Sequence, residues 1–147
     1  MRMLGRVLTL SFAILLSGCC GKELGRVAFS APGTANSTVS LEAGEVSFWT
    51  EIDIEYEGPA SLEYKIDLAQ GGSVVATATC NPLGQLPVKT GWVETNLGNS
   101  HTRRGAGKMT CSAQLPKAGA TEVRATLAFG TTPTKLKLTK ADLVVKQ

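Results

Sequence analysis

The chain has 147 residues, 15 of them basic and 12 acidic, and its formal net charge is +3 at pH 7. Two of the basic residues, Arg2 and Arg6, lie in a leading segment that we expect to be removed, which leaves 13 basic against 12 acidic residues. A nearly neutral chain of this length predicts one domain of ordinary size. It argues against a general nucleic-acid-binding protein, which would be clearly basic.

The first 18 residues show the three zones of an export signal. Arg2 and Arg6 make the start positive, residues 7–16 form a nearly unbroken apolar run, and Leu16-Ser17-Gly18-Cys19 follows. A helix needs roughly 20 apolar residues to span a bilayer, so a run of about ten is too short to remain as a membrane anchor. We therefore expect residues 1–18 to be a signal helix that is cleaved off.

The motif Leu16-Ser17-Gly18-Cys19 resembles the lipobox of bacterial lipoproteins, and the resemblance covers only residues 1–19. It implies that a diacylglycerol, with fatty acyl chains such as palmitate, is attached to the sulfur of Cys19. It also implies cleavage between Gly18 and Cys19 and frequent acylation of the new amino group. Two or three acyl chains hold a protein stably on a membrane. A plain secretory signal is the alternative.

The residue after the modified cysteine bears on sorting in envelopes with two membranes. The resemblance implies that an aspartate at this position retains a lipoprotein at the inner membrane, whereas this chain has Cys20. We therefore expect an outer-membrane lipoprotein that faces the periplasm or the cell surface. Residues 19–23 would form its lipidated tether and residues 24–147 its domain.

The four cysteines stand at positions 19, 20, 80 and 111. Export leads to a compartment where disulfides persist, so Cys80 and Cys111, both in strand-like segments, form the natural pair; two buried free thiols are the alternative. Cys20 is left over, either as a free thiol or as the link of a disulfide-bonded dimer. With one histidine and no Cys-x-x-Cys pair we expect no zinc site, and no cofactor is predicted.

The mature region consists of short strand-like runs separated by Gly, Pro, Asn and Ser. This spacing predicts an all-β domain, a single antiparallel β-sandwich of jelly-roll or immunoglobulin-like type with about seven to nine strands. The expected strands are residues 24–30, 38–41, 46–56, 62–68, 74–80, 88–95, 108–115, 122–129 and 135–145.

Alternation is clearest in residues 46–56, where one side is mostly apolar and the other mostly acidic. Residues 62–68 keep the same period, and turn residues separate the two runs. We therefore expect them to pair as a hairpin, with residues 74–80 as the third strand of a meander. Near the end of the chain the apolar phase changes between Leu138 and Leu143, which predicts a bulge near residues 139–141.

The acidic side of that first run and the two tryptophans are candidates for binding. The acidic side predicts a solvated face with cross-strand lysine partners, and less readily a calcium site. Trp49 falls on this polar side and Trp92 follows Gly91, so either ring could be exposed and stack on a sugar, or else pack in the core. The carboxylates are Glu51, Asp53, Glu55 and Glu57, and the lysines considered as partners are Lys65, Lys135 and Lys137.

Residues 96–108 form the longest polar stretch, which we expect to be a loop. It holds the only histidine, His101, and three cations, Arg103, Arg104 and Lys108. The arginines could bind a carboxylate, a phosphate or an anionic lipid headgroup. A mobile hairpin tip kept soluble by its charges is the alternative.

No catalytic motif stands out, since a Ser-His-Asp arrangement would depend on His101 in a flexible loop and no Gly-x-Ser-x-Gly elbow is present. We predict a lipid-anchored, non-catalytic β-sandwich that binds a protein or glycan partner, or has a structural role, at the cell envelope. A carbohydrate-binding module that uses Trp49 or Trp92 is the second hypothesis, and a small hydrolase is the third.

Overall fold

The computed structural model describes residues 21–147, and all regular elements in this range are β-strands. The expected signal segment with its lipobox, the lipidation site Cys19 and the neighbouring Cys20 lie outside the described residues. Within the described range, no helix has the length and hydropathy needed to cross a membrane.

Nine strands make up the described domain, and each expected strand corresponds to one of them. β2 and β7 begin several residues earlier than expected. The strands are β1 (Glu23–Val27), β2 (Gly33–Leu41), β3 (Gly44–Glu57), β4 (Ser61–Gln70), β5 (Ser73–Cys80), β6 (Val88–Leu97), β7 (Ser100–Leu115), β8 (Gly119–Thr131) and β9 (Lys135–Lys146).

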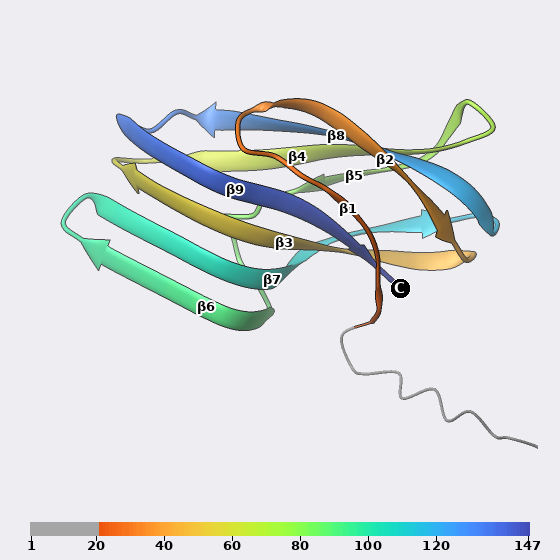
Figure 1. Ribbon diagram of the computed structural model, residues 1–147, viewed down its shortest axis with the longest axis horizontal. Helices are drawn as coiled ribbons and strands as arrows, with labels where there is room; N and C mark the ends of the chain where they lie inside the picture. The colour runs from red at the N-terminus through yellow and green to blue at the C-terminus, as the bar shows by residue number, and fades with distance from the viewer. Residues whose placement is uncertain (1–20) are drawn as a thin grey trace, which may run out of the picture.

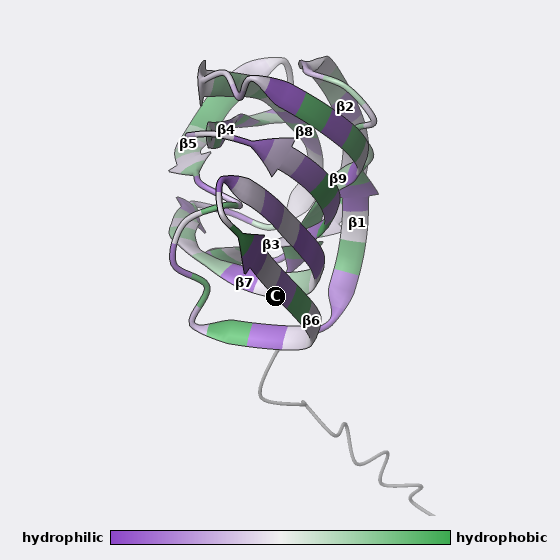
Figure 2. Ribbon diagram, turned by 90° about the vertical axis from the view of Figure 1, so that its left-hand side faces the viewer, coloured by the Kyte–Doolittle hydropathy of each residue, from purple (hydrophilic) through white to green (hydrophobic). Residues whose placement is uncertain are grey.

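The strands form two antiparallel sheets that face each other, which confirms the predicted β-sandwich (Figure 1). Sheet A has the strand order β1-β9-β3-β7-β6, and sheet B has the order β2-β8-β4-β5. Hydrophobic and hydrophilic residues alternate along the strands (Figure 2). Such alternation is typical of strands that bury one face and expose the other.

Eight of the nine strands pair in a nested order. β1 pairs with β9, β2 with β8, β3 with β7 and β4 with β5, so the chain folds like one long hairpin rolled onto itself. This is the strand order of a jelly roll, one of the two predicted sandwich types. β6 belongs to none of these pairs, because it is inserted between β5 and β7 and extends the edge of sheet A beside β7.

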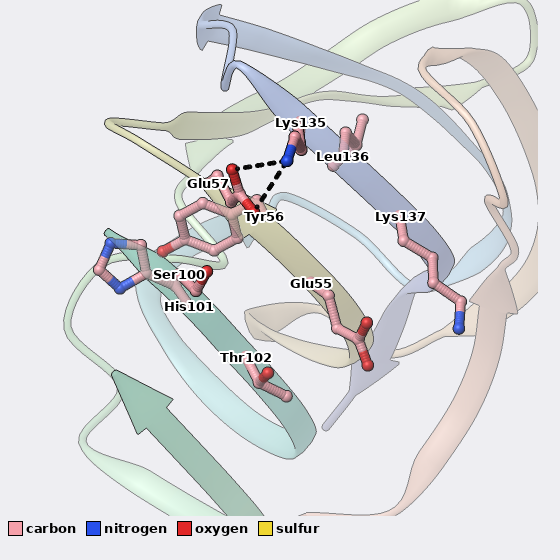
Figure 3. A pocket seen from close by; sticks show the side chains of 9 residues that line it. All are labelled: Glu55, Tyr56, Glu57, Ser100, His101, Thr102, Lys135, Leu136 and Lys137. Carbon is pink, nitrogen blue, oxygen red and sulfur yellow. Dashed lines mark hydrogen bonds and ion pairs between the residues drawn. The ribbon is translucent and has the colours of Figure 1, made fainter. Parts of the chain in front are cut away.

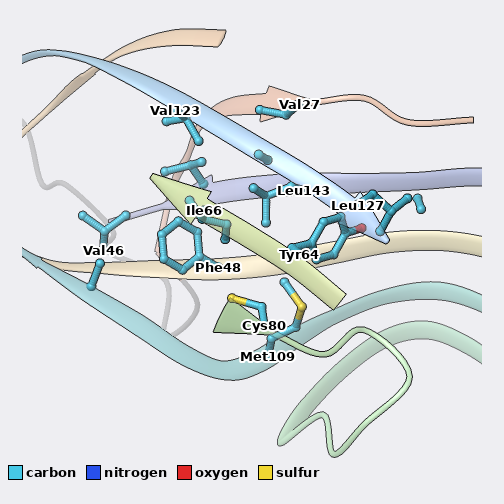
Figure 4. Close-up of a cluster of buried hydrophobic side chains, with 14 of the residues drawn as sticks. Val27, Val46, Phe48, Tyr64, Ile66, Cys80, Met109, Val123, Leu127 and Leu143 are labelled. Atoms are coloured by element: carbon cyan, nitrogen blue, oxygen red, sulfur yellow. The ribbon is translucent and has the colours of Figure 1, made fainter. Parts of the chain in front are cut away.

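The hydrophobic core lies between the sheets and is built from the inward side of the strands (Figure 4). Phe48 and Ile52 of β3 and Leu62 of β4 are at most 1 % exposed. The hydroxyls of Thr50 in β3 and Tyr64 in β4 lie 3.0 Å apart, so one hydrogen bond joins the sheets through the core. Burial raises the pKa of Tyr64. Either hydroxyl left buried alone would cost about 1–3 kcal/mol.

Cys80 at the end of β5 and Cys111 in β7 form the predicted disulfide, with their Cα atoms 5.3 Å apart. Because β5 belongs to sheet B and β7 to sheet A, the bond ties the two sheets together. It also holds the start of residues 81–87, the connection from β5 to the inserted strand β6.

The predicted hairpin between residues 46–56 and 62–68 is wrong. β3 lies in sheet A and β4 in sheet B, so residues 58–60 carry the chain from one sheet to the other. Two strands that face each other across a core show the same alternation as two strands that pair, and the sequence pattern does not separate these cases. The β4–β5 pair of the expected meander is confirmed, and a register shift between Leu138 and Lys140 confirms the bulge in β9.

Candidate binding site on the β6–β7 hairpin

Residues 96–108, expected to be a loop, form the tip and one strand of a β-hairpin instead. β6 runs to Leu97 and β7 starts at Ser100, so only Gly98 and Asn99 lie in the turn. Gly98 has a φ of +62°, as required of the first turn residue in a type II′ hairpin. The polar composition of residues 96–108 suggested a loop. A hairpin at the edge of a sheet is polar as well, because much of both of its faces is in contact with water.

The two faces of the hairpin divide the predicted contact residues. His101 and Arg103 lie on the inner face, the side of sheet A that continues into the core, whereas Arg104 and Lys108 lie on the outer face. Trp92 of β6 is half-buried and packs against the core. The structure thus brings Trp92, His101 and Arg103 to one face and separates them from Arg104 and Lys108.

Residues 81–87 pack against the base of the hairpin and are held at several points. The side-chain oxygen of Asn81 accepts a hydrogen bond from the backbone N–H of Leu83, with the two atoms 3.0 Å apart. Leu86 is buried against β7, and it fits because Gly107 has no side chain: a Cβ there would stand 2.7 Å from Leu86 Cδ1. The disulfide of Cys80 holds the start of the segment.

A bulge in β6 shapes the same region. Between Thr90 and Val93 the register shifts, so that Gly91 and Trp92 together stand opposite Gly105. Gly105 has a φ of +134°, and a Cβ on it would lie 2.6 Å from the carbonyl oxygen of Gly91 and 2.8 Å from Cα of Trp92. This close approach therefore requires glycine at position 105.

A cavity of about 360 Å³ lies between residues 82–86 and the inner face of the hairpin. Its polar side chains are Gln85 on the segment and, on the wall that the hairpin forms, Lys89, Trp92, Glu94 and Arg103. Glu94 connects the others, since its carboxylate oxygens lie 3.1 Å from Arg103 Nη2 and 3.8 Å from Lys89 Nζ. The indole N–H of Trp92 donates a hydrogen bond to Glu94 over 3.2 Å.

The charges of this wall differ in how firmly they are held. The hydrogen bond from Trp92, with the nearby charges of Arg103 and Lys89, holds the pKa of Glu94 below its usual range. The Arg103 side chain is 13 % exposed and also donates to the carbonyl oxygen of Thr102. Lys89 is 43 % exposed, and its ammonium lies 5.5 Å from the centroid of the Trp92 ring. Two cations against one carboxylate leave the wall with one net positive charge.

Sequence reasoning missed three of the polar side chains of this cavity, Gln85, Lys89 and Glu94. Glu94 could have been found, because it lies two positions after Trp92 and side chains at that spacing share one face of a strand. Gln85 and Lys89 reach the cavity only through the packing of residues 81–87 and the bulge at Gly91, which no local pattern predicts.

Trp49 lies on the predicted outer face of β3 but is only 3 % exposed, which removes it from the candidate contact surface. The ammonium of Lys146 lies 3.9 Å from the centroid of its ring, and Val144 and Lys108 stand beside it on the neighbouring strands. Long side chains on an outer sheet face can therefore bury an aromatic ring beneath their stems. Among the described residues the buried indole N–H of Trp49 has no hydrogen-bond partner.

The acidic side of β3 faces cations from neighbouring strands, as expected for a solvated face. Lys65 is not among them, because β4 lies in the other sheet. In residues 21–147 no group of three or more His, Cys, Asp or Glu side chains is placed to hold a metal ion. The ion pairs are Glu51 with Arg26 and Lys140, Asp53 with Arg104, and Glu57 with Lys135, while Glu55 stands opposite Lys137 in the strand register.

His101 belongs to a second, shallow cavity of about 290 Å³ near the hairpin tip (Figure 3). Its ring lies beside that of Tyr56, with centroids 5.0 Å apart, and its Nδ1 is 2.7 Å from the side-chain oxygen of Asn96. The carboxylate of Glu57 also borders this cavity but pairs with Lys135. Ser100 and Thr102 border the cavity as well, and within the described residues His101 has no hydrogen bond to a carboxylate or a hydroxyl.

No protein-family model matches this chain, and no curated protein matches its sequence. The functional interpretation therefore comes from the chemistry of the hairpin and from the fold that holds it.

Proposed function

We propose that this chain is a bacterial lipoprotein held on the cell envelope by lipid on Cys19, and that its non-catalytic β-sandwich binds an envelope partner through the inner face of the β6–β7 hairpin. One observation carries the binding role. β6 and residues 81–87 lie outside the nested strand pairs, yet a disulfide and two closely packed glycines fix them around a polar cavity. Rigid structure that the jelly roll does not need supports recognition of a ligand or partner.

The start of the described domain supports a position close to the membrane. The backbone N–H of Lys22 donates to the carbonyl oxygen of Gln147 over 3.0 Å, and the reverse hydrogen bond spans 3.4 Å. In the described part of the chain these hydrogen bonds hold Lys22, three residues after Cys19, and three residues span at most about 10 Å in an extended chain. Lipid on Cys19 would hold the sandwich against the bilayer surface.

Site-specific photocrosslinking in intact cells tests this proposal. A photoreactive residue replaces Asn96 on the inner face or, as the control, its neighbour Thr95, which is exposed on the outer face. We expect a discrete adduct from position 96 that is absent from position 95. The same adducts from both positions, or none from position 96, would contradict the binding role.

The anchor is tested on the same cells by the intact mass of the membrane-extracted protein. We expect the loss of residues 1–18 and a gain of several hundred daltons from acyl chains, and we expect Cys19→Ser but not Cys20→Ser to abolish this gain. An unlipidated wild-type protein would refute the anchor.

A carbohydrate-binding module is the second candidate function. Trp92 favours it, because its half-buried ring borders a polar cavity whose other groups can hydrogen-bond to hydroxyls. Trp49 no longer contributes to this candidate, since its ring is buried.

A further inference from the structure

We infer that the cavity beside Trp92 is a binding subsite for a sugar ring that carries a carboxylate, as in a uronic acid. This inference rests on the proposed binding role of the hairpin and names the chemistry of its ligand. The argument uses the size and rigidity of the cavity, then its hydrogen-bonding groups, and then its charge.

The volume of about 360 Å³ is near the lower end of the range for small-molecule sites and suits a ligand of one or two rings. The walls are formed before any ligand arrives. Leu86 is seated over Gly107, and Cys80 is held by its disulfide. A preformed site loses little conformational entropy on binding, which matters most for a small polar ligand with few contacts.

The groups on the wall match a hydroxylated ring. The part of the Trp92 ring that borders the cavity offers an apolar surface to the C–H groups of a sugar. Glu94 is held ionised and fixed by Arg103 and Trp92, so its carboxylate can accept hydrogen bonds from hydroxyls. Gln85 is exposed on the opposite wall and has both a donor and an acceptor. An apolar ligand would leave these polar groups without partners.

The charge of the wall favours a carboxylate on the ligand, and Lys89 is the group that would bind it. Its ammonium is 3.8 Å from Glu94, beyond hydrogen-bond distance, and it makes none of the hydrogen bonds found among residues 21–147. Arg103 has a different role, because it is largely buried and is used to hold Glu94 and the backbone of Thr102. We therefore regard Lys89 as the carboxylate-binding residue and Arg103 as a positioning residue.

The test compares glucuronic acid with glucose, which share a ring and differ in whether C6 is a carboxylate or an alcohol. The protein is the full chain as extracted from its membrane in detergent. The readout is the Trp92 indole N–H signal in a ¹⁵N–¹H NMR spectrum, assigned with Trp92→Phe, since this N–H is bonded to Glu94 inside the cavity. We expect a saturable shift with glucuronic acid, and binding of glucose weaker by about tenfold or more, as for the loss of one charge-assisted hydrogen bond.

Lys89→Met is expected to remove the preference for glucuronic acid while the glucose response persists. The matched control is Lys65→Met, which removes the same charge from an exposed strand position of sheet B. Both variants should keep the dispersed spectrum of the folded protein. No saturable shift with glucuronic acid, equal affinity for both sugars, or equal effects of the two substitutions would overturn the inference. An adduct from position 96 without glucuronic acid binding would leave the proposed function standing and refute only the ligand class.

Discussion

Arg26 forms salt bridges with three carboxylates on the outer face of sheet A. Its guanidinium lies 2.9 Å from Glu23, 2.9 Å from Glu51 and 2.8 Å from Asp142, a carboxylate that is largely buried. The hydrogen bond from Lys140, together with Arg26, holds the pKa of Glu51 below its usual range. The hydrogen bond between Arg26 and Glu23 lowers the pKa of Glu23 and raises the pKa of Arg26.

These shifts predict the direction of the pH dependence. A carboxyl whose pKa is lower in the folded state stabilises that state above the unfolded pKa, about 4.3 for glutamate, and this contribution is lost as the pH falls through the folded value. We expect Arg26→Met to lower the free energy of unfolding at pH 7 by about 1.5–3 kcal/mol, the range for hydrogen bonds to charged groups. The difference from wild type should narrow at pH 3.

Urea unfolding at both pH values measures this difference. Arg124→Met is the control. In the described part of the chain Arg124 forms one salt bridge, and its partner Glu122 is partly exposed. This substitution should change the stability by less than about 1 kcal/mol. A destabilisation by Arg26→Met that is as large at pH 3 as at pH 7 would contradict the electrostatic origin.

At the scale of elements, the β6–β7 hairpin depends on the glycines of β7 as much as on its turn. Its strands come close enough for the bulge at Gly91 only because Gly105 has no side chain, and Leu86 is seated only because Gly107 has none. Glycines in a polar segment suggest a loop when they are considered locally. Here they mark positions where another part of the chain approaches the backbone of a strand.

Gly105→Ala is expected to destabilise the protein more than Gly71→Ala. Alanine adopts the φ of +58° at position 71 at a cost of roughly 1–2 kcal/mol, whereas the φ of +134° at position 105 lies outside the regions that alanine readily adopts. Only at position 105 would the new Cβ also collide with backbone atoms, at 2.6 and 2.8 Å, whereas nothing lies within 4 Å at position 71. Thermal unfolding measures the two costs, and hydrogen exchange should show loss of protection in β6 for Gly105→Ala alone. Equal effects of the two substitutions would exclude the close approach as the cause.

At the scale of the whole molecule, the nested strand pairs bring distant segments together and the disulfide crosses between the sheets. The pairs β1–β9 and β2–β8 join opposite ends of the domain, so the sandwich forms only when nearly the whole chain is in place. The Cys80–Cys111 bond encloses β6 and residues 81–87, which belong to no nested pair. The added element is thus tied to the jelly roll at its base.

Removal of the disulfide by Cys80→Ala with Cys111→Ala should lower the free energy of unfolding by roughly 3–4 kcal/mol. This is the chain-entropy value for a loop of the observed separation of 31 residues. Urea unfolding with and without a reducing agent measures it. The reducing agent should destabilise the wild type by a similar amount and leave the double variant unchanged. If the reducing agent leaves the free energy of unfolding of the wild type unchanged, the stabilising role of the disulfide is refuted.

Local pattern in the sequence was sufficient for the all-β class, the number and order of the strands, the Cys80–Cys111 pair and the bulge near Thr139. Each of these follows from side-chain periodicity over a few residues or from the chemistry of export. The resemblance of Leu16-Ser17-Gly18-Cys19 to a lipobox predicts where the protein is held, and the mass measurement tests this prediction.

The tertiary structure alone decided which strands pair, the burial of Trp49, and the conversion of residues 96–108 from an expected loop into a hairpin. Alternation reports that a strand has a buried face but not which strand covers it, so β3 and β4 were expected to pair and instead lie in opposite sheets. The cavity of Lys89, Trp92 and Glu94 depends on contacts of Leu86 with Gly107 and of Gly91 with Gly105. Contacts between segments so far apart leave no periodic signal, because only the folded backbone brings them together.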